Sequence, residues 1–136
     1  MTDKKKILII EDEKDIRRTL QLQLEAEGFE VIAASDGEDG LRKAKTEGPD
    51  LLILDLRLPK LPGEEVCREL RKDEKYLSMP IIMLTAKGTD ADWVRGMVIG
   101  ANYYIPKPYD MKDLLETMQL LLRGEQPSDK PPIARQ

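Results

Sequence analysis

Three short runs of this chain are apolar at nearly every position. The runs are KILII at 6–10, LLILD at 51–55 and PIIMLT at 80–85. A strand with one face in water alternates apolar and polar residues, so a continuous run indicates a strand that is buried on both faces. Strands of this kind belong to parallel sheets that helices cover on both sides. The sequence therefore predicts an α/β fold.

The segments between these runs carry apolar residues at helical spacing. Ile16, Leu20 and Leu24 recur every four residues, and Gly28 marks the end of that helix. The expected helices are 13–27, 37–47, 64–73, 90–99 and 110–123, and the expected strands are 6–10, 29–34, 51–55, 80–85 and 102–105. This alternation predicts a three-layer, doubly wound (βα)5 arrangement around a parallel sheet.

Length and charge limit what the chain can be. Its 136 residues suit one domain, which we assign to 1–124, followed by a proline-rich tail or linker at 125–136. The net charge of -4 argues against direct binding to nucleic acid or to an anionic membrane. No apolar run approaches the roughly 18 residues of a membrane span, and no signal-peptide pattern is present. We therefore expect a cytoplasmic protein.

The chain contains no histidine and one cysteine, Cys67. It therefore lacks the commonest general base, the Ser-His and Cys-His nucleophile pairs and any histidine-ligated metal site. A single cysteine also excludes an internal disulfide and fits a reducing compartment. Any chemistry must depend on carboxylates, hydroxyls and lysines.

Polar side chains follow the predicted strands where the strands end. In an open parallel sheet, ligands bind outside the carboxyl ends of the strands. If strands 6–10 and 51–55 are neighbours, Glu11, Asp12 and Asp55 converge. Thr85 and Lys107 then lie beside them. Acids at strand ends also cap helices, but two prolines delay the helix after Asp55.

Three carboxylates in one pocket repel one another unless a cation lies among them. Oxygen ligands without histidine or cysteine favour Mg²⁺. A lysine ammonium and a threonine hydroxyl beside such a site suit a phosphoryl group. Without a histidine-activated serine or cysteine, a carboxylate is the candidate acceptor, and Asp55 suits this role best.

Other phosphate chemistries lack their motifs in this chain. There is no GxxxxGK[ST] loop, and no GxGxxG follows the first predicted strand. A haloacid-dehalogenase-type phosphatase needs a second aspartate two residues after the first, where this chain has Arg57. Formation of an aspartyl phosphate is therefore the interpretation that the strand-end residues favour.

Four segments at successive strand ends resemble a known family. They are KILIIEDE, DLLILDLRLPKLPG, IIMLTAKG and GANYYIPKPY. From residue 5 to about residue 123 the chain resembles the receiver domain of two-component response regulators, of the chemotaxis-regulator type. The resemblance implies a flavodoxin-like fold with strand order 2-1-3-4-5. It also implies that the domain is not an enzyme, beyond its own phosphorylation and autodephosphorylation.

The resemblance implies a role for each matching residue. Asp55 is the phosphoacceptor, and Mg²⁺ is bound by Asp12, Asp55 and the main-chain carbonyl of Arg57, with Glu11 acting through water. Three further residues meet or respond to the phosphoryl group. They are Thr85, which moves toward it, Lys107, which pairs with its oxygens, and Tyr104, which changes rotamer. A half-buried structural aromatic is the alternative role for the last of these.

Some positions depart from the common pattern. Glu11 replaces aspartate in the acidic pair, and Arg57 and Lys87 occupy the variable positions that influence the lifetime of the phosphate. Asn102-Tyr103 and Thr117 replace charged residues that support a dimer in transcription-factor relatives. We therefore expect a monomer or a weak dimer.

The function that follows is a phosphorylation-controlled switch. The resemblance implies that a histidine kinase or histidine phosphotransfer protein is the donor, and because the chain has no histidine, the phosphohistidine must come from a separate protein. The expected output surface comprises 90–99, 102–105 and 110–123. Trp93 is either a contact residue of this surface or a partly buried structural tryptophan. It controls either a downstream effector protein or a missing C-terminal output domain. A degenerate, non-phosphorylated interaction domain is the rival hypothesis.

Overall fold

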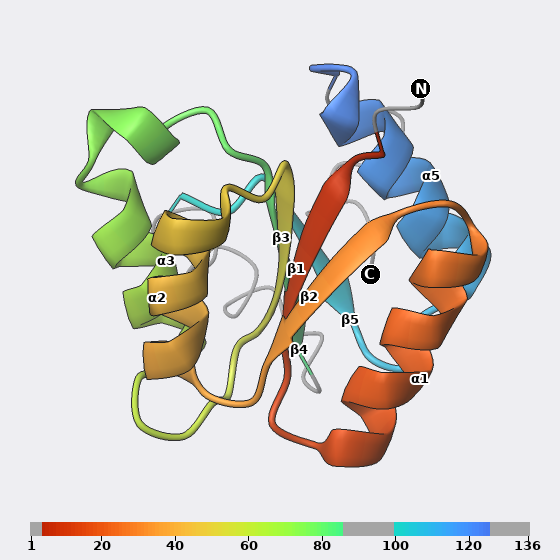
Figure 1. Cartoon of the computed structure of the whole chain (residues 1–136), viewed down its shortest axis with the longest axis horizontal. Helices are drawn as coiled ribbons and strands as arrows, with labels where there is room; N and C mark the ends of the chain where they lie inside the picture. The colour runs from red at the N-terminus through yellow and green to blue at the C-terminus, as the bar shows by residue number, and fades with distance from the viewer. Residues whose placement is uncertain (1–3, 86–99, 126–136) are drawn as a thin grey trace.

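The centre of the fold is one parallel sheet with the strand order β2-β1-β3-β4-β5 (Figure 1). The computed structural model describes residues 4–85 and 100–125. The strands are β1 (Lys6–Ile10), β2 (Glu30–Ala34), β3 (Leu51–Asp55), β4 (Ile81–Thr85) and β5 (Tyr103–Pro106). All four strand pairs are parallel. The predicted α/β fold and strand order are confirmed.

Helices cover both faces of this sheet. They are α1 (Lys14–Ala26), α2 (Gly37–Glu47), α3 (Gly63–Arg71) and α5 (Met111–Leu122). Helices α1 and α5 lie on one face, and α2 and α3 lie on the other (Figure 1). The helix expected at 90–99 and the tail after 125 lie outside the described residues. Within the described ranges, no helix has the length and apolar character needed to cross a membrane.

The predicted boundaries differ from the observed ones mainly near α3. This helix ends at Arg71, and a short 3-10 helix, η1 (Glu74–Tyr76), follows it. The Asp73 carboxylate accepts a hydrogen bond from the amide of Lys75 at 3.0 Å and so begins η1. This short helix was not predicted, because three residues are too few to show a periodicity.

The core consists of two clusters, one on each face of the sheet. In β3, Leu52 and Leu54 pack toward α2 and α3, whereas Leu51 and Ile53 pack toward α1 and α5. This two-sided burial explains why the run is apolar at every position. Each buried aliphatic side chain contributes about 1.5–3 kcal/mol, so β3 holds the residue at its end, Asp55, in a fixed place.

Two glycines allow the loop after β3 to pack closely. A Cβ on Gly37 would lie 1.8 Å from the carbonyl oxygen of Leu61, and one on Gly63 would lie 2.3 Å from that of Asp55. The amide of Gly37 also donates to the carbonyl of Pro59 at 3.2 Å. The loop is therefore fixed against the starts of α2 and α3.

Cys67 offers a test of how α3 packs on the sheet. The side chain is fully buried, and burial raises the pKa of its thiol from an ordinary value of 9.0 to about 11, although nearby arginines oppose the shift. The thiolate is the reactive form, so at pH 8 this pKa leaves about a hundredfold less of it. We expect a chromogenic thiol reagent to react at least about a hundredfold more slowly with the native chain than with the chain unfolded in urea. Similar rates would contradict this packing.

Candidate functional site

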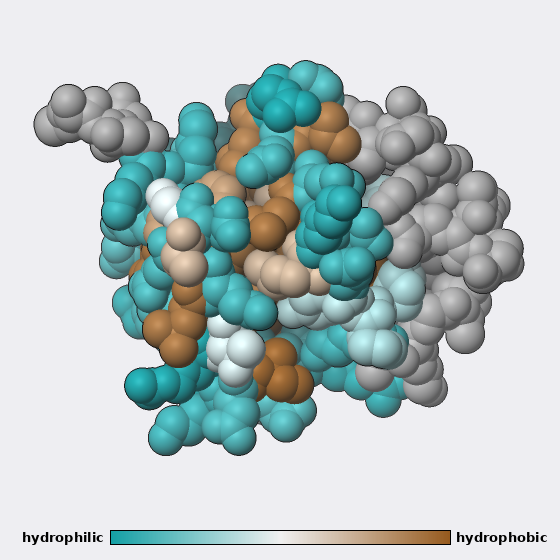
Figure 2. All heavy atoms as spheres, turned by 90° about the vertical axis from the view of Figure 1, so that its right-hand side faces the viewer, coloured by the Kyte–Doolittle hydropathy of each residue, from teal (hydrophilic) through white to brown (hydrophobic). Residues whose placement is uncertain are grey.

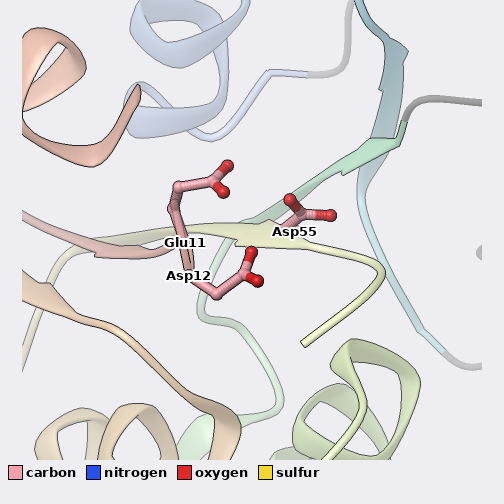
Figure 3. A group of neighbouring side chains, drawn as sticks. All are labelled: Glu11, Asp12 and Asp55. Carbon is pink, nitrogen blue, oxygen red and sulfur yellow. The ribbon is translucent and has the colours of Figure 1, made fainter. Parts of the chain in front are cut away.

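Three acids meet at the carboxyl ends of β1 and β3. These strands are paired, so Glu11, which follows β1, lies beside Asp55, the last residue of β3. One carboxylate oxygen from each of Glu11, Asp12 and Asp55 lies within 4.8 Å of the others. Figure 3 shows the three carboxylates around a shared space. Glu11 and Asp55 are 3% and 7% exposed, whereas Asp12 is exposed.

Lys107 brings a positive charge into this cluster from the loop after β5. Its Nζ lies 3.1 Å from Glu11 Oε1 and 2.9 Å from Asp55 Oδ2. Its main-chain amide donates to the carbonyl of Thr85 at 2.6 Å, which ties the loop to the end of β4. The Lys107–Pro108 peptide bond is cis.

The charges in the cluster change one another's proton affinity. Burial and the charge of Asp55 raise the pKa of the Glu11 carboxyl, although the Glu13 amide and Lys107 oppose them. Burial acts to lower the pKa of the Lys107 ammonium, but the hydrogen bonds and charges of Asp55 and Glu11 outweigh it and raise that pKa. Lys107 therefore stays protonated and compensates the two buried acids.

Main-chain amides fix the two buried carboxylates further. The amide of Glu13 donates to Glu11 Oε2 at 3.0 Å, and the amide of Arg57 donates to Asp55 Oδ1 at 3.0 Å. The backbone of Arg57 therefore lies next to the cluster. Across residues 4–85 and 100–125, no hydrogen bond or ion pair holds the carboxylate of Asp12. Its oxygens are free to bind a ligand from solvent.

The oxygens of the cluster fit a small divalent cation. Two oxygens bound to one Mg²⁺ lie at most about 4.2 Å apart, so the observed separations, all within 4.8 Å, need only small adjustments. Carboxylate oxygens are also the donors that this ion prefers. The donor set is therefore suited to Mg²⁺.

Thr85 and Tyr104 lie on the strands beside the acids. Leu84 is the register partner of Asp55, and Thr85 follows it at the end of β4. Tyr104 pairs with Met83, and both belong to the core cluster on the α2 and α3 face. Because side chains alternate along a strand, Thr85 is directed to that same face. Tyr104 is 2% exposed, so it is fully buried and not half-buried, and its role in the switch stays a prediction.

The structure also shows further neighbours of the site, of which Ile16, Tyr109 and Gly63 were not predicted to lie there. Ile16, Pro108 and Tyr109 line a shallow pocket beside Lys107. Gly63 permits the close approach of α3 to the backbone of Asp55. Partly buried apolar residues and single glycines occur throughout such folds, so nothing in their sequence context distinguishes these positions.

A doubly wound parallel sheet with a charge-compensated acidic cluster at its carboxyl end defines an α/β protein suited to binding a cation and an anionic group there. The family model described as "Response regulator receiver domain" matches residues 7–119. The chain therefore belongs to the response regulator receiver domain family. Members of this family generally bind Mg²⁺ at an acidic pocket.

Relatives and solved structures agree with this assignment. The alkaline phosphatase synthesis transcriptional regulatory protein PhoP of Bacillus subtilis is 48% identical over 119 residues, which cover 88% of this chain and 49% of that protein. The response regulator ArlR of Staphylococcus aureus is 44% identical over 123 residues, or 90% of this chain and 55% of that protein. This chain thus spans about half the length of these regulators.

Among solved structures, a CheY-like response regulator receiver domain protein from Methanospirillum hungatei has a TM-score of 0.83 and 33% identity. The similarity covers 90% of this chain and 96% of that one. A putative response regulator from Chloroflexus aurantiacus has a TM-score of 0.85 and 32% identity, covering 89% of this chain and 99% of that one. Both structures share the fold described above.

Removing the charge of Asp12 should affect stability and metal binding in opposite directions. In metal-free buffer, Asp12→Asn should raise the free energy of unfolding by about 0.5 kcal/mol, because it relieves repulsion with Glu11 and Asp55. It should also lower the affinity for Mg²⁺ at least about tenfold. Urea denaturation in a chelator and calorimetric titration measure the two effects.

Asp15→Asn is the matched control for this prediction. Asp15 is an exposed acid in the first turn of α1 and lies outside the cluster. Its loss should leave the affinity for Mg²⁺ unchanged and slightly lower the stability, because Asp15 interacts favourably with the helix dipole. If both variants changed Mg²⁺ binding equally, Asp12 would not be a ligand.

Proposed function

We propose that Asp55 accepts a phosphoryl group from a phosphohistidine of a partner protein, and that the reaction requires Mg²⁺. Asp12, Asp55 and the main-chain carbonyl of Arg57 bind the ion, and Glu11 acts through water. The observation that carries this proposal is the Lys107 ammonium, 2.9 Å from Asp55 Oδ2. It lies where it can turn from the carboxylates to the oxygens of an arriving phosphoryl group.

The transfer is a displacement at phosphorus. A carboxylate oxygen of Asp55 attacks the phosphorus in line, the bond to the imidazole nitrogen of the donor breaks, and its electron pair stays on that nitrogen. The product on this chain is an acyl phosphate, whose oxygens Lys107 and the bound cation neutralise. Attack of water on the phosphorus later releases inorganic phosphate and restores Asp55.

Phosphorylation then changes the surface of the domain. Thr85 hydrogen-bonds the phosphoryl group and shifts toward it, and the Tyr104 side chain follows by changing its rotamer. Their position on one face of neighbouring strands supports this coupling. The affected surface comprises β5 and α5, together with the segment 90–99, which is assigned to it from the sequence alone and lies outside the described residues. This surface controls an effector protein or an attached output domain. PhoP, a transcriptional regulatory protein about twice as long as the matched region, illustrates the second arrangement.

A monomer or weak dimer is supported by two residues that stand where relatives carry dimer-forming charges. Thr117 is 4% exposed and its hydroxyl donates to the carbonyl of Asp113 at 2.9 Å. The side-chain oxygen of Asn102 accepts hydrogen bonds from Arg71 at 2.9 Å and from the amide of Ile81 at 2.8 Å. Both side chains are thus engaged within their own chain.

The identity of the acceptor can be tested by intact mass. After incubation with Mg²⁺ and acetyl phosphate, the wild type should gain one acid-stable, base-labile phosphoryl group, and Asp55→Ala should gain none. Asp50→Asn, which changes an aspartate at the opposite end of β3, should be phosphorylated like the wild type. Chelating the metal should abolish the adduct. An adduct that persists in Asp55→Ala would place the acceptor elsewhere, and no adduct at all would favour a non-phosphorylated interaction domain.

A protein donor must contact the surface around Asp55 to bring its histidine into line. Figure 2 shows the side of the molecule formed by α1 and α5, where hydrophobic residues lie as small patches among hydrophilic ones. The pocket lined by Ile16, Pro108 and Tyr109 adjoins Lys107 and so lies directly beside the site. We infer that apolar side chains of the donor pack there during transfer.

Ile16→Asp should separate docking from chemistry. A carboxylate in an apolar contact is costly to desolvate, so transfer from a phosphorylated histidine kinase should slow at least about tenfold. Phosphorylation by acetyl phosphate, which needs no docking surface, should keep its rate. Leu22→Asp is the control, because Leu22 is 56% exposed on the same helix but does not line the pocket. Equal slowing of both variants would contradict docking at this pocket.

A further inference from the structure

The side chain of Arg17, in the first turn of α1, folds back toward the end of β1. Its Nη1 donates to the main-chain carbonyl of Glu11 at 2.8 Å and to that of Asp12 at 3.3 Å. Its own amide donates to the carbonyl of Glu13 at 2.9 Å. Arg17 thus binds three consecutive carbonyls of the short connection between β1 and α1, which carries two of the three acids.

The connection has few other restraints near Asp12. The amide of Glu11 still pairs with the carbonyl of Ala34 at 3.1 Å, so restraint by the sheet reaches as far as Glu11. Glu13, the residue before α1, makes no side-chain capping hydrogen bond. The carboxylate of Asp12 has no hydrogen bond or ion pair with the described part of the chain, so its direction depends on its main chain.

The carboxylates of the other two acids are restrained by contacts of their own. Its carboxylate is held independently by Lys107 at 3.1 Å and by the amide of Glu13 at 3.0 Å. Asp55 is held by Lys107 and by the amide of Arg57. Of the three acids, Asp12 therefore depends most on the backbone that Arg17 holds.

We propose that Arg17 is a positioning residue for the metal site. By binding the carbonyls of Glu11 and Asp12, its guanidinium sets the direction of the Asp12 carboxylate toward Asp55 before Mg²⁺ arrives. This inference rests on the proposed function, because it assigns to Arg17 an effect on the ion that the three acids bind. Partners that orient metal ligands in this way typically change metal affinity by about 10–100-fold when they are removed.

Removing the side chain of Arg17 has two opposite expected effects on Mg²⁺ affinity, one from the loss of its charge and one from the loss of its hydrogen bonds. A guanidinium near the acids repels Mg²⁺, so the loss of its charge alone would tighten binding of the ion. Loss of the two hydrogen bonds releases the loop and weakens binding. The neighbouring Arg18 carries the same charge but is exposed and makes no hydrogen bond or ion pair within the described ranges. Arg18→Ala therefore measures the effect of charge.

The experiment measures Mg²⁺ binding by calorimetry for the wild type, Arg17→Ala, Arg17→Lys and Arg18→Ala, each checked for folding by circular dichroism. We expect Arg17→Ala to weaken binding about tenfold and Arg18→Ala to leave it unchanged or tighten it slightly. The affinity of Arg17→Lys for Mg²⁺ should lie between those of the wild type and Arg17→Ala. The lysine ammonium keeps the charge and can reach one carbonyl, but it lacks the planar fork of the guanidinium. If Arg17→Ala does not fold, Arg17→Lys against the wild type still gives the test.

The outcomes separate this inference from the proposed function. Equal affinity of Arg17→Ala and Arg18→Ala, or tighter binding by Arg17→Ala, would overturn the positioning role while leaving the metal site intact. Failure of the wild type itself to bind Mg²⁺, or binding that survives Asp55→Ala, would overturn the metal site and the proposed function with it.

Discussion

The rest of the site depends on one interaction, the pairing of the Lys107 ammonium with the carboxylates of Glu11 and Asp55. The two carboxylates are nearly buried, and a buried charge without a partner costs several kcal/mol. Their partner comes from a distant part of the chain, 96 residues after Glu11 and 52 after Asp55. The acids are therefore compensated only when β1, β3 and the loop after β5 have assembled in the right order. The site is therefore charge-compensated only when the sheet has formed with the correct strand order.

The sheet supplies rigidity where the proposed phosphoryl transfer needs it. An in-line displacement requires an acceptor oxygen in a fixed place, and β3 provides this by burying side chains on both of its faces. Its loop is fixed by contacts that only glycine permits at positions 37 and 63. Asp12, by contrast, stands on a short connection whose carbonyls at Glu11 and Asp12 accept hydrogen bonds from Arg17. In the proposed function, the site thus combines a rigid acceptor, Asp55, with a metal ligand, Asp12, that is less firmly held.

Much of the fold could be predicted, because burial determines which positions of a strand or helix are apolar, and this pattern is visible in the sequence. Strands such as 51–55 were placed to the residue, and the convergence of Glu11, Asp12 and Asp55 followed from the rule that parallel strands end together. Features that depend on where one side chain points across space were not predictable. The back-folded side chain of Arg17 and the complete burial of Tyr104 are examples. The helix expected at 90–99 and the roles of the individual site residues stay predictions.

The two core clusters described above have no residue in common, because the sheet lies between them. If the alternation of side chains along the strands is continued, Glu11, Asp55 and Lys107 are directed to the face of α1 and α5, whereas Thr85 and Tyr104 are directed to the face of α2 and α3. The interior is thus divided into two compartments by a wall of hydrogen-bonded backbone. A bond made to Asp55 on one side can alter packing on the other only around the rim of that wall, where Thr85 lies. In the proposed function, a change at Asp55 would therefore reach the other face at this boundary and not through the interior of the sheet.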